Sequence, residues 1–192
     1  QICGDIYDDS MWLIDLVENL LSVTRIGEGR MQIRQSAELV DEVIREALKH
    51  TGQSRTGRTI KVEEEDELIL AKMDARLIVQ VLINLIGNAV KYTPQGTDIT
   101  VRVRKEKAEN SQVIISVCDL GDGIPDDRKE RVFDMFYTGS DQVADSRRSL
   151  GLGLGLCRSI INAHGGKIWI SDNIPHGAVV TFTLPAEEVA LN

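Results

Sequence analysis

The segment Asp119-Leu-Gly-Asp-Gly-Ile-Pro125 follows the apolar, β-branched run Val113-Ile-Ile-Ser-Val117. The run predicts a buried strand, and the segment places the carboxylate of Asp119 where that strand ends. Gly121 and Gly123 allow backbone torsions that other residues avoid, so a ligand can approach the chain closely. A carboxylate accepts hydrogen bonds and does not neutralise a phosphate, so Asp119 suits an N–H donor such as the exocyclic amine of adenine. Taken alone, the segment also fits an ordinary strand-to-helix turn.

The composition is that of one globular domain with an appendage: 192 residues, 42% of them hydrophobic and 27% charged. The formal net charge is −8 and Lys and Arg form no block, so no nucleic-acid partner is expected. Cys3, Cys118 and Cys157 lack the spacing of metal ligands, and the last two are predicted to be small core residues in a reducing compartment. The sequence contains no apolar run of membrane-spanning length and no signal peptide. Because the chain begins inside a predicted helix, we expect a fragment, with any membrane segment upstream.

Residues 1–30 hold a predicted helix, from about Ile2 to Arg25, whose apolar positions follow a three-four spacing. Its apolar stripe is wide, which favours a multi-helix bundle over a two-stranded coiled coil. Such a helix needs a partner from a missing segment or from a second chain. The alternative is that it packs on the domain that follows.

The rest of the chain alternates helical and strand patterns. The predicted helices cover 37–50 with Ser36 as N-cap, 75–91 with Asp74 as N-cap, 126–131, and the segment from the Gly151 loop to about 164. The predicted strands cover 59–62 and 68–71 as a hairpin-like pair, 99–103 and 113–118 as an antiparallel hairpin, 167–171 and 179–184.

Three polar residues share one face of the helix predicted at 75–91: Asn84, Asn88 and Lys91. An amide oxygen can ligate a hard cation and an ammonium group can reach a phosphate. A solvated polar edge is the alternative interpretation of this face.

A glycine-rich stretch, Gly151-Leu-Gly-Leu-Gly-Leu156, opens the last predicted helix. Free N–H groups and the positive end of a helix dipole favour an anion at such a place. The stretch is not a Walker A loop, since no Gly-Lys-Ser/Thr follows. The polar segment 137–149 before it is long for a connection in a compact domain, which favours a functional or mobile loop.

The order of these motifs resembles the ATP-binding domain of sensor histidine kinases, within the GHKL group that includes the gyrase and MutL ATPases. Residues Asn84–Thr93 resemble the N box, Asp119–Pro125 the first glycine box, Phe133–Phe136 the F box and Gly151–Leu156 the second glycine box. The long helix and Ala163-His-Gly-Gly-Lys167 are similar to potassium-responsive sensor kinases of the KdpD kind.

The resemblance implies an α/β sandwich of the Bergerat type, in which a mixed, mainly antiparallel sheet of about five strands carries three helices on one face. It also implies one long bundle helix ahead of this domain. Residues 1–30 would be the second helix of a dimerisation and phosphoacceptor hairpin, residues 34–187 the ATP-binding catalytic domain, and residues 188–192 a tail.

The implied cofactors are ATP and Mg²⁺. Asn84 and Lys91 would be catalytic, Asn88 would ligate Mg²⁺ through its amide oxygen, and Lys91 would contact phosphate. Asp119 would hold the adenine amine, and Thr181 would reach the adenine site through its hydroxyl or a water molecule. The implied ATP-binding residues are Asn88, Lys91, Tyr92, Asp119, Gly121, Gly123, Ile124, Phe136, Arg147, Arg148, Gly151, Leu152, Gly153, Leu154, Gly155, Leu156 and Thr181.

Two positions depart from relatives of this group. Hydrolysing members carry a glutamate general base where this chain has Asn84, and an amide lacks that basicity, so we expect ATP to be held for transfer and hydrolysed poorly. Many sensor kinases carry an arginine directly after the F-box aromatic pair, where this chain has Thr138. Arg147 or Arg148 is the expected source of the missing positive charge.

None of the three histidines, His50, His164 and His176, fits the family's phosphoacceptor, which lies in the first hairpin helix before an acidic residue. We expect all three to be surface or cap residues, and the acceptor to lie upstream of residue 1.

The function implied by the resemblance is that of the catalytic portion of a two-component sensor histidine kinase. The γ-phosphoryl group of ATP would pass to a histidine outside the fragment and then to an aspartate of a response-regulator receiver domain. The fragment alone is not expected to autophosphorylate. The full-length protein is expected to dimerise through the helix hairpin, with this fragment on the cytoplasmic side of an inner-membrane-anchored bacterial receptor. The alternatives are a related Ser kinase or hydrolysing ATPase, and a non-catalytic nucleotide-sensing or scaffold module.

Overall fold

The computed structural model describes residues 33–51, 59–65, 68–106, 111–137 and 151–187. The predictions for residues 1–30, for Cys3, Thr138, Arg147 and Arg148, and for the tail at 188–192 lie outside these ranges.

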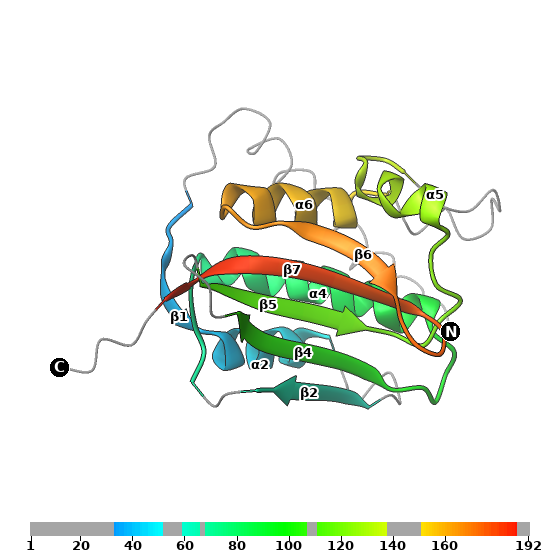
Figure 1. Ribbon diagram of the computed structural model, residues 1–192, viewed down its shortest axis with the longest axis horizontal. Coiled ribbons are helices and arrows are strands. Elements are labelled where there is room, and N and C mark those ends of the chain that lie inside the picture. The colour runs from blue at the N-terminus through cyan, green and yellow to red at the C-terminus, as the bar shows by residue number, and fades with distance from the viewer. Residues whose placement is uncertain (1–32, 52–58, 66–67, 107–110, 138–150, 188–192) are drawn as a thin grey trace, which may run out of the picture.

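The described chain folds into a mixed sheet of seven strands with helices packed on it (Figure 1). The strands are β1 (Ser36–Leu39), β2 (Ile60–Glu64), β3 (Leu70–Met73), β4 (Ile99–Glu106), β5 (Gln112–Cys118), β6 (Ile168–Asp172) and β7 (Ala178–Glu187). The helices are α2 (Val40–His50), α4 (Ala75–Tyr92), α5 (Asp126–Lys129), the short 3₁₀ helix η1 (Arg131–Phe133) and α6 (Gly153–Ala163). Along the sheet the strand order is β1-β3-β7-β5-β4-β2, and β6 also pairs with β7.

The sheet is mixed and mainly antiparallel, as predicted, because β2 runs parallel to β4 while the other pairs are antiparallel. The prediction of about five strands was wrong, since the sheet has seven. Part of the difference comes from β1, because residues 37–39 were assigned to the helix predicted at 37–50 and Ser36 to its N-cap. Their main-chain groups pair with β3, from Ser36 opposite Met73 to Leu39 opposite Leu70, so α2 begins only at Val40. Ser36 is therefore not the N-cap of α2, where Leu39 stands without a side-chain cap.

The predicted pairing of the strands near 59–62 and 68–71 was also wrong. β2 lies at one edge of the sheet beside β4, whereas β3 lies between β1 and β7. A parallel pair needs a crossover connection, and the chain supplies it through β3 and α4 before it returns as β4. The predicted β4–β5 hairpin is confirmed, with Val101 opposite Val117 in the register.

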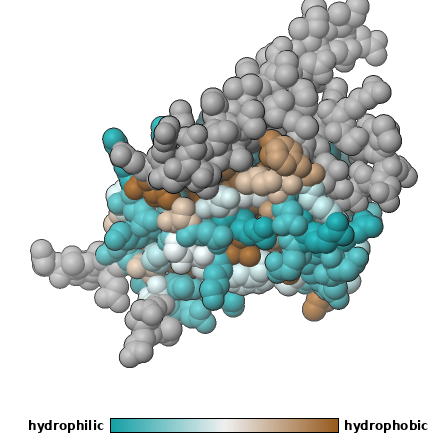
Figure 2. Space-filling view, turned by 90° about the horizontal axis from the view of Figure 1, so that it is seen from above, coloured by the Kyte–Doolittle hydropathy of each residue, from teal (hydrophilic) through white to brown (hydrophobic). Residues whose placement is uncertain are grey.

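Helix α4 lies in the middle of the helical layer, between α2 and α6 (Figure 1). Its predicted N-cap is confirmed, because the Asp74 carboxylate accepts a hydrogen bond from the Leu77 N–H at 3.5 Å. The apolar face of α4 is buried against the sheet through seven residues: Leu77, Ile78, Val81, Leu82, Leu85, Ile86 and Ala89. Figure 2, seen from above the view of Figure 1, shows mostly hydrophilic residues on the described surface, with hydrophobic ones in small patches.

His164 ends α6 and is buried, with 2% of its surface exposed, so the expectation of a cap residue holds but that of a surface residue does not. Its Nε2 accepts a hydrogen bond from the Asp74 N–H at 3.0 Å, and its Nδ1 faces the Ile160 carbonyl at 2.8 Å. The ring is therefore neutral with the proton on Nδ1, and it joins the end of α6 to the start of α4.

Cys118 and Cys157 are buried and not joined in a disulfide, which confirms the prediction of small core residues. Burial raises the pKa of the Cys157 thiol to about 12, and burial also raises the pKa of Cys118. Both thiols therefore stay protonated near neutral pH.

Glu64 on β2 has a buried carboxylate oxygen, Oε1, without a hydrogen-bond partner among the described residues. Burial, and after it the charge of Asp41, raise the pKa of Glu64 above its ordinary value of 4.5. Because the pKa is higher in the folded chain, the free energy of unfolding falls as the pH rises through the interval above 4.5.

Glu64→Gln is therefore expected to stabilise the protein near neutral pH by about half a kcal/mol. The gain should disappear at a pH below the ordinary pKa of 4.5, where the wild-type carboxyl is protonated in both states. Denaturant unfolding at the two pH values measures the difference. An equal gain at both would show that the charge of Glu64 is not its cause.

Candidate functional site

Four segments meet at one end of the sheet: the end of β5 with the loop after it, the C-terminal end of α4, α5, and the turn between β6 and β7 (Figure 1). Backbone contacts fix this arrangement. A Cβ atom at Gly121 would lie 2.6 Å from the Tyr92 carbonyl oxygen, and one at Gly177 would lie 2.1 Å from the Asp119 carbonyl oxygen. The loop after β5 is therefore held between the end of α4 and the β6–β7 turn.

These segments, together with the residues after α5 and the start of α6, line a pocket of about 360 Å³. One part of the lining is apolar, and the rest carries a small number of polar and charged groups, the usual character of a small-molecule site. The lining residues are Leu85, Asn88, Ala89, Lys91, Tyr92, Val117, Asp119, Gly121, Asp122, Gly123, Ile124, Pro125, Arg128, Val132, Tyr137, Gly151, Gly153, Leu154, Ala178 and Val180.

The carboxylate of Asp119 is held by one of its two oxygens. Its Oδ1 accepts hydrogen bonds from the Gly121 N–H at 2.8 Å and from the Ala178 N–H at 3.1 Å. The Asp119 N–H in turn donates to the Ala178 carbonyl at 2.9 Å, so the residue is tied to β7 through both main chain and side chain. Within the described part of the chain no hydrogen bond to Oδ2 is found, so this oxygen remains for a donor on a ligand.

Asn88 and Lys91, both on α4, line the same pocket as Asp119. The Lys91 ammonium lies 4.9 Å from the ring centre of Tyr92, whose side chain is exposed at the pocket rim. Arg128 of α5 also contributes to the lining, so two basic side chains face a pocket that contains the Asp119 carboxylate. A ligand with an amine at one end and anionic groups at the other would match these charges.

Asn84 lies one turn before Asn88 and is not part of the pocket lining. Its amide packs beneath the start of α6, where a Cβ atom at Gly153 would lie 3.8 Å from the Asn84 Cγ. Its Nδ2 is buried without a hydrogen-bond partner among the described residues. The Asn84 side chain is an amide and has no basic group.

Ten of the predicted ATP-binding residues line the pocket: Asn88, Lys91, Tyr92, Asp119, Gly121, Gly123, Ile124, Gly151, Gly153 and Leu154. Others support it from outside. Phe136 is 65% exposed with a φ of 66°, and its N–H donates to the Gly151 carbonyl at 3.0 Å, so it braces the glycine-rich stretch. Leu152 and Leu156 are buried in the core, and Gly155 packs against Met135 and the Phe133 carbonyl.

Thr181 does not lie at the pocket. Its hydroxyl hydrogen-bonds the Ser116 hydroxyl at 2.9 Å, on the face of the sheet opposite the helices. Successive residues of a strand point to opposite faces, and the β7 residues that line the pocket are Ala178 and Val180. The wall that β7 supplies is therefore apolar, and the Thr181 hydroxyl lies on the other face of the sheet.

Sequence reasoning missed several lining residues. The apolar ones on predicted elements, namely Leu85, Ala89, Val117, Ala178 and Val180, could have been found by following the period of the helix or strand inward from Asn88, Asp119 and the start of β7. Tyr137 follows the F box directly. Pro125 closes the segment that begins at Asp119 but was not named as a ligand contact. Arg128 and Val132 had no distinctive signal, because their place depends on how α5 and η1 fold over the pocket.

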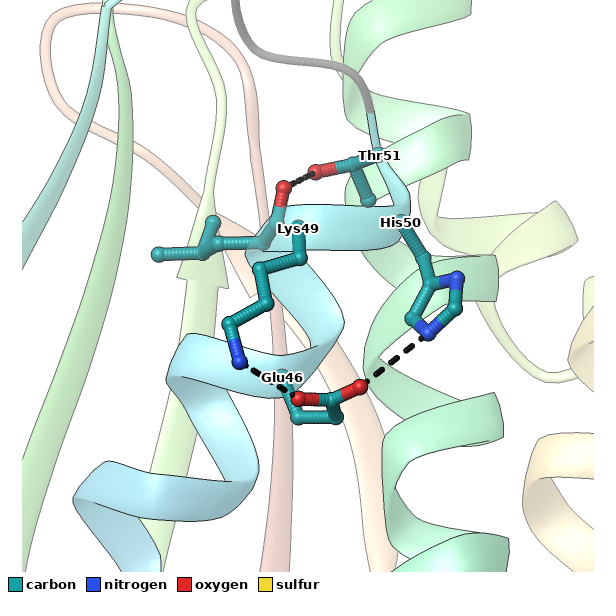
Figure 3. Close-up of polar contacts among 5 residues, drawn as sticks. Glu46, Lys49, His50 and Thr51 are labelled. Atoms are coloured by element: carbon teal, nitrogen blue, oxygen red, sulfur yellow. Dashed lines mark hydrogen bonds and ion pairs between the residues drawn. The ribbon is translucent and has the colours of Figure 1, made fainter.

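The other two histidines are partnered at the surface. In Figure 3 the His50 Nε2 at the end of α2 lies 3.3 Å from the Glu46 carboxylate, which also binds Lys49 at 2.9 Å. His176 in the β6–β7 turn faces the Gly121 carbonyl with its Nδ1 at 3.1 Å. These positions fit the prediction that His50 and His176 are surface or cap residues.

The fold and the pocket identify a nucleotide-binding α/β domain, and the family model "Histidine kinase-, DNA gyrase B-, and HSP90-like ATPase" matches residues 73–188. The chain belongs to this family. Within it, the chain resembles the ATP-binding catalytic portion of sensor histidine kinases, as its four motifs predicted.

The relatives agree with this assignment. The chain is 41% identical over 187 residues to the sensor protein KdpD of Clostridium acetobutylicum, covering 97% of this chain and 20% of that protein. It is 33% identical over 172 residues to the adaptive-response sensory kinase SasA of Gloeothece citriformis, covering 88% of this chain and 43% of that protein. The predicted likeness to the KdpD kind is thus confirmed.

Among solved structures, the catalytic domain of the histidine kinase ThkA has a TM-score of 0.66 and 33% identity, covering 79% of this chain and 95% of that one. ThkA in complex with the response regulator protein TrrA has a TM-score of 0.68 and 29% identity, covering 91% of this chain and 49% of that one.

The chain spans a fifth of the length of the curated KdpD protein and less than half of the length of SasA. Among the described residues, no helix combines the length and apolar character needed to cross a membrane.

Proposed function

We propose that this domain binds ATP and Mg²⁺ in the pocket and donates the γ-phosphoryl group to a histidine outside residues 1–192. The observation that carries the proposal is the fixed carboxylate of Asp119. Two backbone hydrogen bonds hold its Oδ1, and its Oδ2 is left to accept a hydrogen bond from a ligand. Asn88 and Lys91 line the same pocket. The adenine base would lie between the apolar side chains of α4, β5 and β7, with its amine on Asp119. Gly121 and Gly123, which also line the pocket, would let the base approach the backbone closely.

The phosphates would extend toward Lys91, Arg128 and the first turn of α6, whose early N–H groups lack intrahelical partners. Asn88 offers an amide oxygen in the same lining, and the described residues contain no cluster of His, Cys, Asp or Glu that could hold a metal without the nucleotide. This donor set fits Mg²⁺, which keeps several waters and binds through few protein oxygens together with phosphates. The ion would neutralise charge on the β- and γ-phosphates during transfer.

The transfer itself is a displacement at phosphorus. An imidazole nitrogen of the acceptor attacks the γ-phosphorus, the bond to the bridging oxygen breaks with its electron pair, and ADP leaves on that oxygen. Lys91 and Arg128 would stabilise charge on the phosphate oxygens, and binding would position the donor for in-line attack. Asn84 supplies no base for water, which favours transfer over hydrolysis.

The phosphoryl group would then pass to an aspartate of a response-regulator receiver domain. The likeness to ThkA, whose structure is known in complex with the response regulator protein TrrA, supports this partner. We also propose that residues 1–30 form the second helix of a dimerisation hairpin. In the full-length protein two copies would pair through it, on the cytoplasmic side of a bacterial membrane where ATP is available.

The test is phosphotransfer in trans. The chain would be incubated with radiolabelled ATP, Mg²⁺ and a separate helix hairpin, made of the proposed first helix upstream of residue 1 joined to residues 1–30. The expected product is a hairpin label that is lost in acid and kept in base, as for a phosphohistidine. A hairpin with its histidine replaced by glutamine is the control.

Acid-stable label would indicate a Ser kinase, and release of inorganic phosphate without labelled hairpin would indicate an ATPase. Absence of nucleotide binding by the folded chain would indicate a scaffold module. Each of these results would contradict the proposal.

A further inference from the structure

The turn between β6 and β7, residues 173–177, touches the loop that begins at Asp119 in several places. The Asn173 Nδ2 donates a hydrogen bond of 2.7 Å to the Asp119 carbonyl. The Asn173 Oδ1 accepts from the Ile174 N–H at 3.0 Å, and the Asn173 N–H donates to the Gly177 carbonyl at 3.0 Å. Asn173 therefore fixes the shape of its own turn and holds the peptide of Asp119 at the same time.

The turn lies against this peptide without room for a side chain. Gly177 has a φ of +108°, and a Cβ atom there would lie 2.1 Å from the Asp119 carbonyl oxygen and 2.9 Å from the Leu120 Cα. Further along the loop that begins at Asp119, a Cβ atom at Gly123 would lie 3.2 Å from the Gly177 carbonyl oxygen. Contact at this distance lets the turn set the position of the loop backbone.

Two further contacts hold the ends of this arrangement. The His176 Nδ1 lies 3.1 Å from the Gly121 carbonyl. Lys129 of α5 binds Asp172, the last residue of β6, at 2.8 Å, so α5 is tied to the strand that leads into the turn. Asn173 itself is absent from the pocket lining, so its influence on a ligand must act through Asp119.

We propose that Asn173 is a positioning residue that orients Asp119 and thereby sets the selectivity of the pocket for adenine over bases without the exocyclic amine. This inference rests on the proposed ATP-binding function. With its main-chain carbonyl held by Asn173 and its Oδ1 held by Gly121 and Ala178, Asp119 can turn neither its peptide nor its side chain. The remaining oxygen, Oδ2, is thus presented in one direction, and only a base with a donor at that place is matched.

The test compares ATP with ITP, which has the same phosphates and sugar but a carbonyl in place of the adenine amine. Wild-type protein is expected to bind ATP more tightly than ITP. In Asn173→Ala, ATP affinity should fall about tenfold, the value of one well-placed hydrogen bond, while ITP affinity changes little. The ratio of the two dissociation constants is the readout, because a general loss of structure would weaken the binding of both nucleotides alike.

A second variant, Asn173→Asp, keeps the shape of the side chain but removes the donor, and it should lower the same ratio. Its added charge acts equally on ATP and ITP and cancels in the ratio. Asn162→Asp, at an exposed site of α6 that lies outside the pocket lining, adds the same charge and should leave the ratio unchanged.

Parallel losses of ATP and ITP affinity, or an unchanged ratio in both Asn173 variants, would overturn the positioning role of Asn173. Failure of the wild-type protein to bind ATP would instead overturn the proposed function. Melting curves of each variant exclude unfolding as a cause, and the isosteric aspartate variant provides the measurement if the alanine variant does not fold.

Discussion

Replacing Asp119 by asparagine is expected to weaken the binding of a non-hydrolysable ATP analogue with Mg²⁺ by about a hundredfold. The carboxylate has two acceptor oxygens, and Oδ1 already receives the N–H groups of Gly121 and Ala178. In the variant the amide oxygen would stay with these two donors, and the amide NH₂ would replace Oδ2. The amide NH₂ and the adenine amine would then face each other as two donors. Losing a charge-assisted hydrogen bond and leaving a donor unpaired costs about 3 kcal/mol.

Titration calorimetry measures this change directly. The matched control is Asp127→Asn on the exposed side of α5, which removes the same charge from a residue outside the pocket lining and should bind as wild type does. Because the amide still accepts the two backbone hydrogen bonds, Asp119→Asn should melt within a few degrees of wild type. Equal affinities of Asp119→Asn and wild type would show that Asp119 does not contact the base.

The site residues were predictable where the functional side chains lie close together in the sequence. Asp119 with its glycines, and Asn88 with Lys91 one turn apart on α4, each form a local pattern, and the structure brings them to one pocket. Thr181 was misplaced although the period of β7 was available. Alternation from the lining residue Val180 assigns Thr181 to the other face of the sheet.

Contacts between distant parts of the chain were not predictable in this way. Residues 36–39 carry a pattern that also suits a helix, and pairing with β3 decides their conformation. Asn173 is recognisable as a turn residue, but its bond to the Asp119 carbonyl spans 54 positions. The same holds for the parallel pairing of β2 with β4, because no local signal states which strand an edge strand will join.

Gly166→Ala is expected to destabilise the protein by about 3 kcal/mol or more, through overlap in the core. A Cβ atom at Gly166 would lie 1.9 Å from the Thr183 carbonyl oxygen and 3.0 Å from the Ile161 Cγ2. The first of these atoms belongs to the backbone of β7. Thr183 is held there by its N–H, which donates to the Lys167 carbonyl at 2.9 Å, and by its hydroxyl, which accepts from the Lys167 N–H at 3.1 Å. The corner between α6 and β6 can therefore not move away without breaking these bonds.

The neighbouring glycine provides the matched control for this prediction. A Cβ atom at Gly165 would meet no atom within 4 Å, and only its φ of +77° opposes a side chain. Gly165→Ala is therefore expected to cost about 1 kcal/mol, the usual price of a left-handed conformation. Urea unfolding of the two variants separates overlap from backbone strain, since both substitutions add the same methyl group at the same corner. Equal losses would show that the corner yields, and that close packing of Gly166 on β7 does not hold α6 against the sheet.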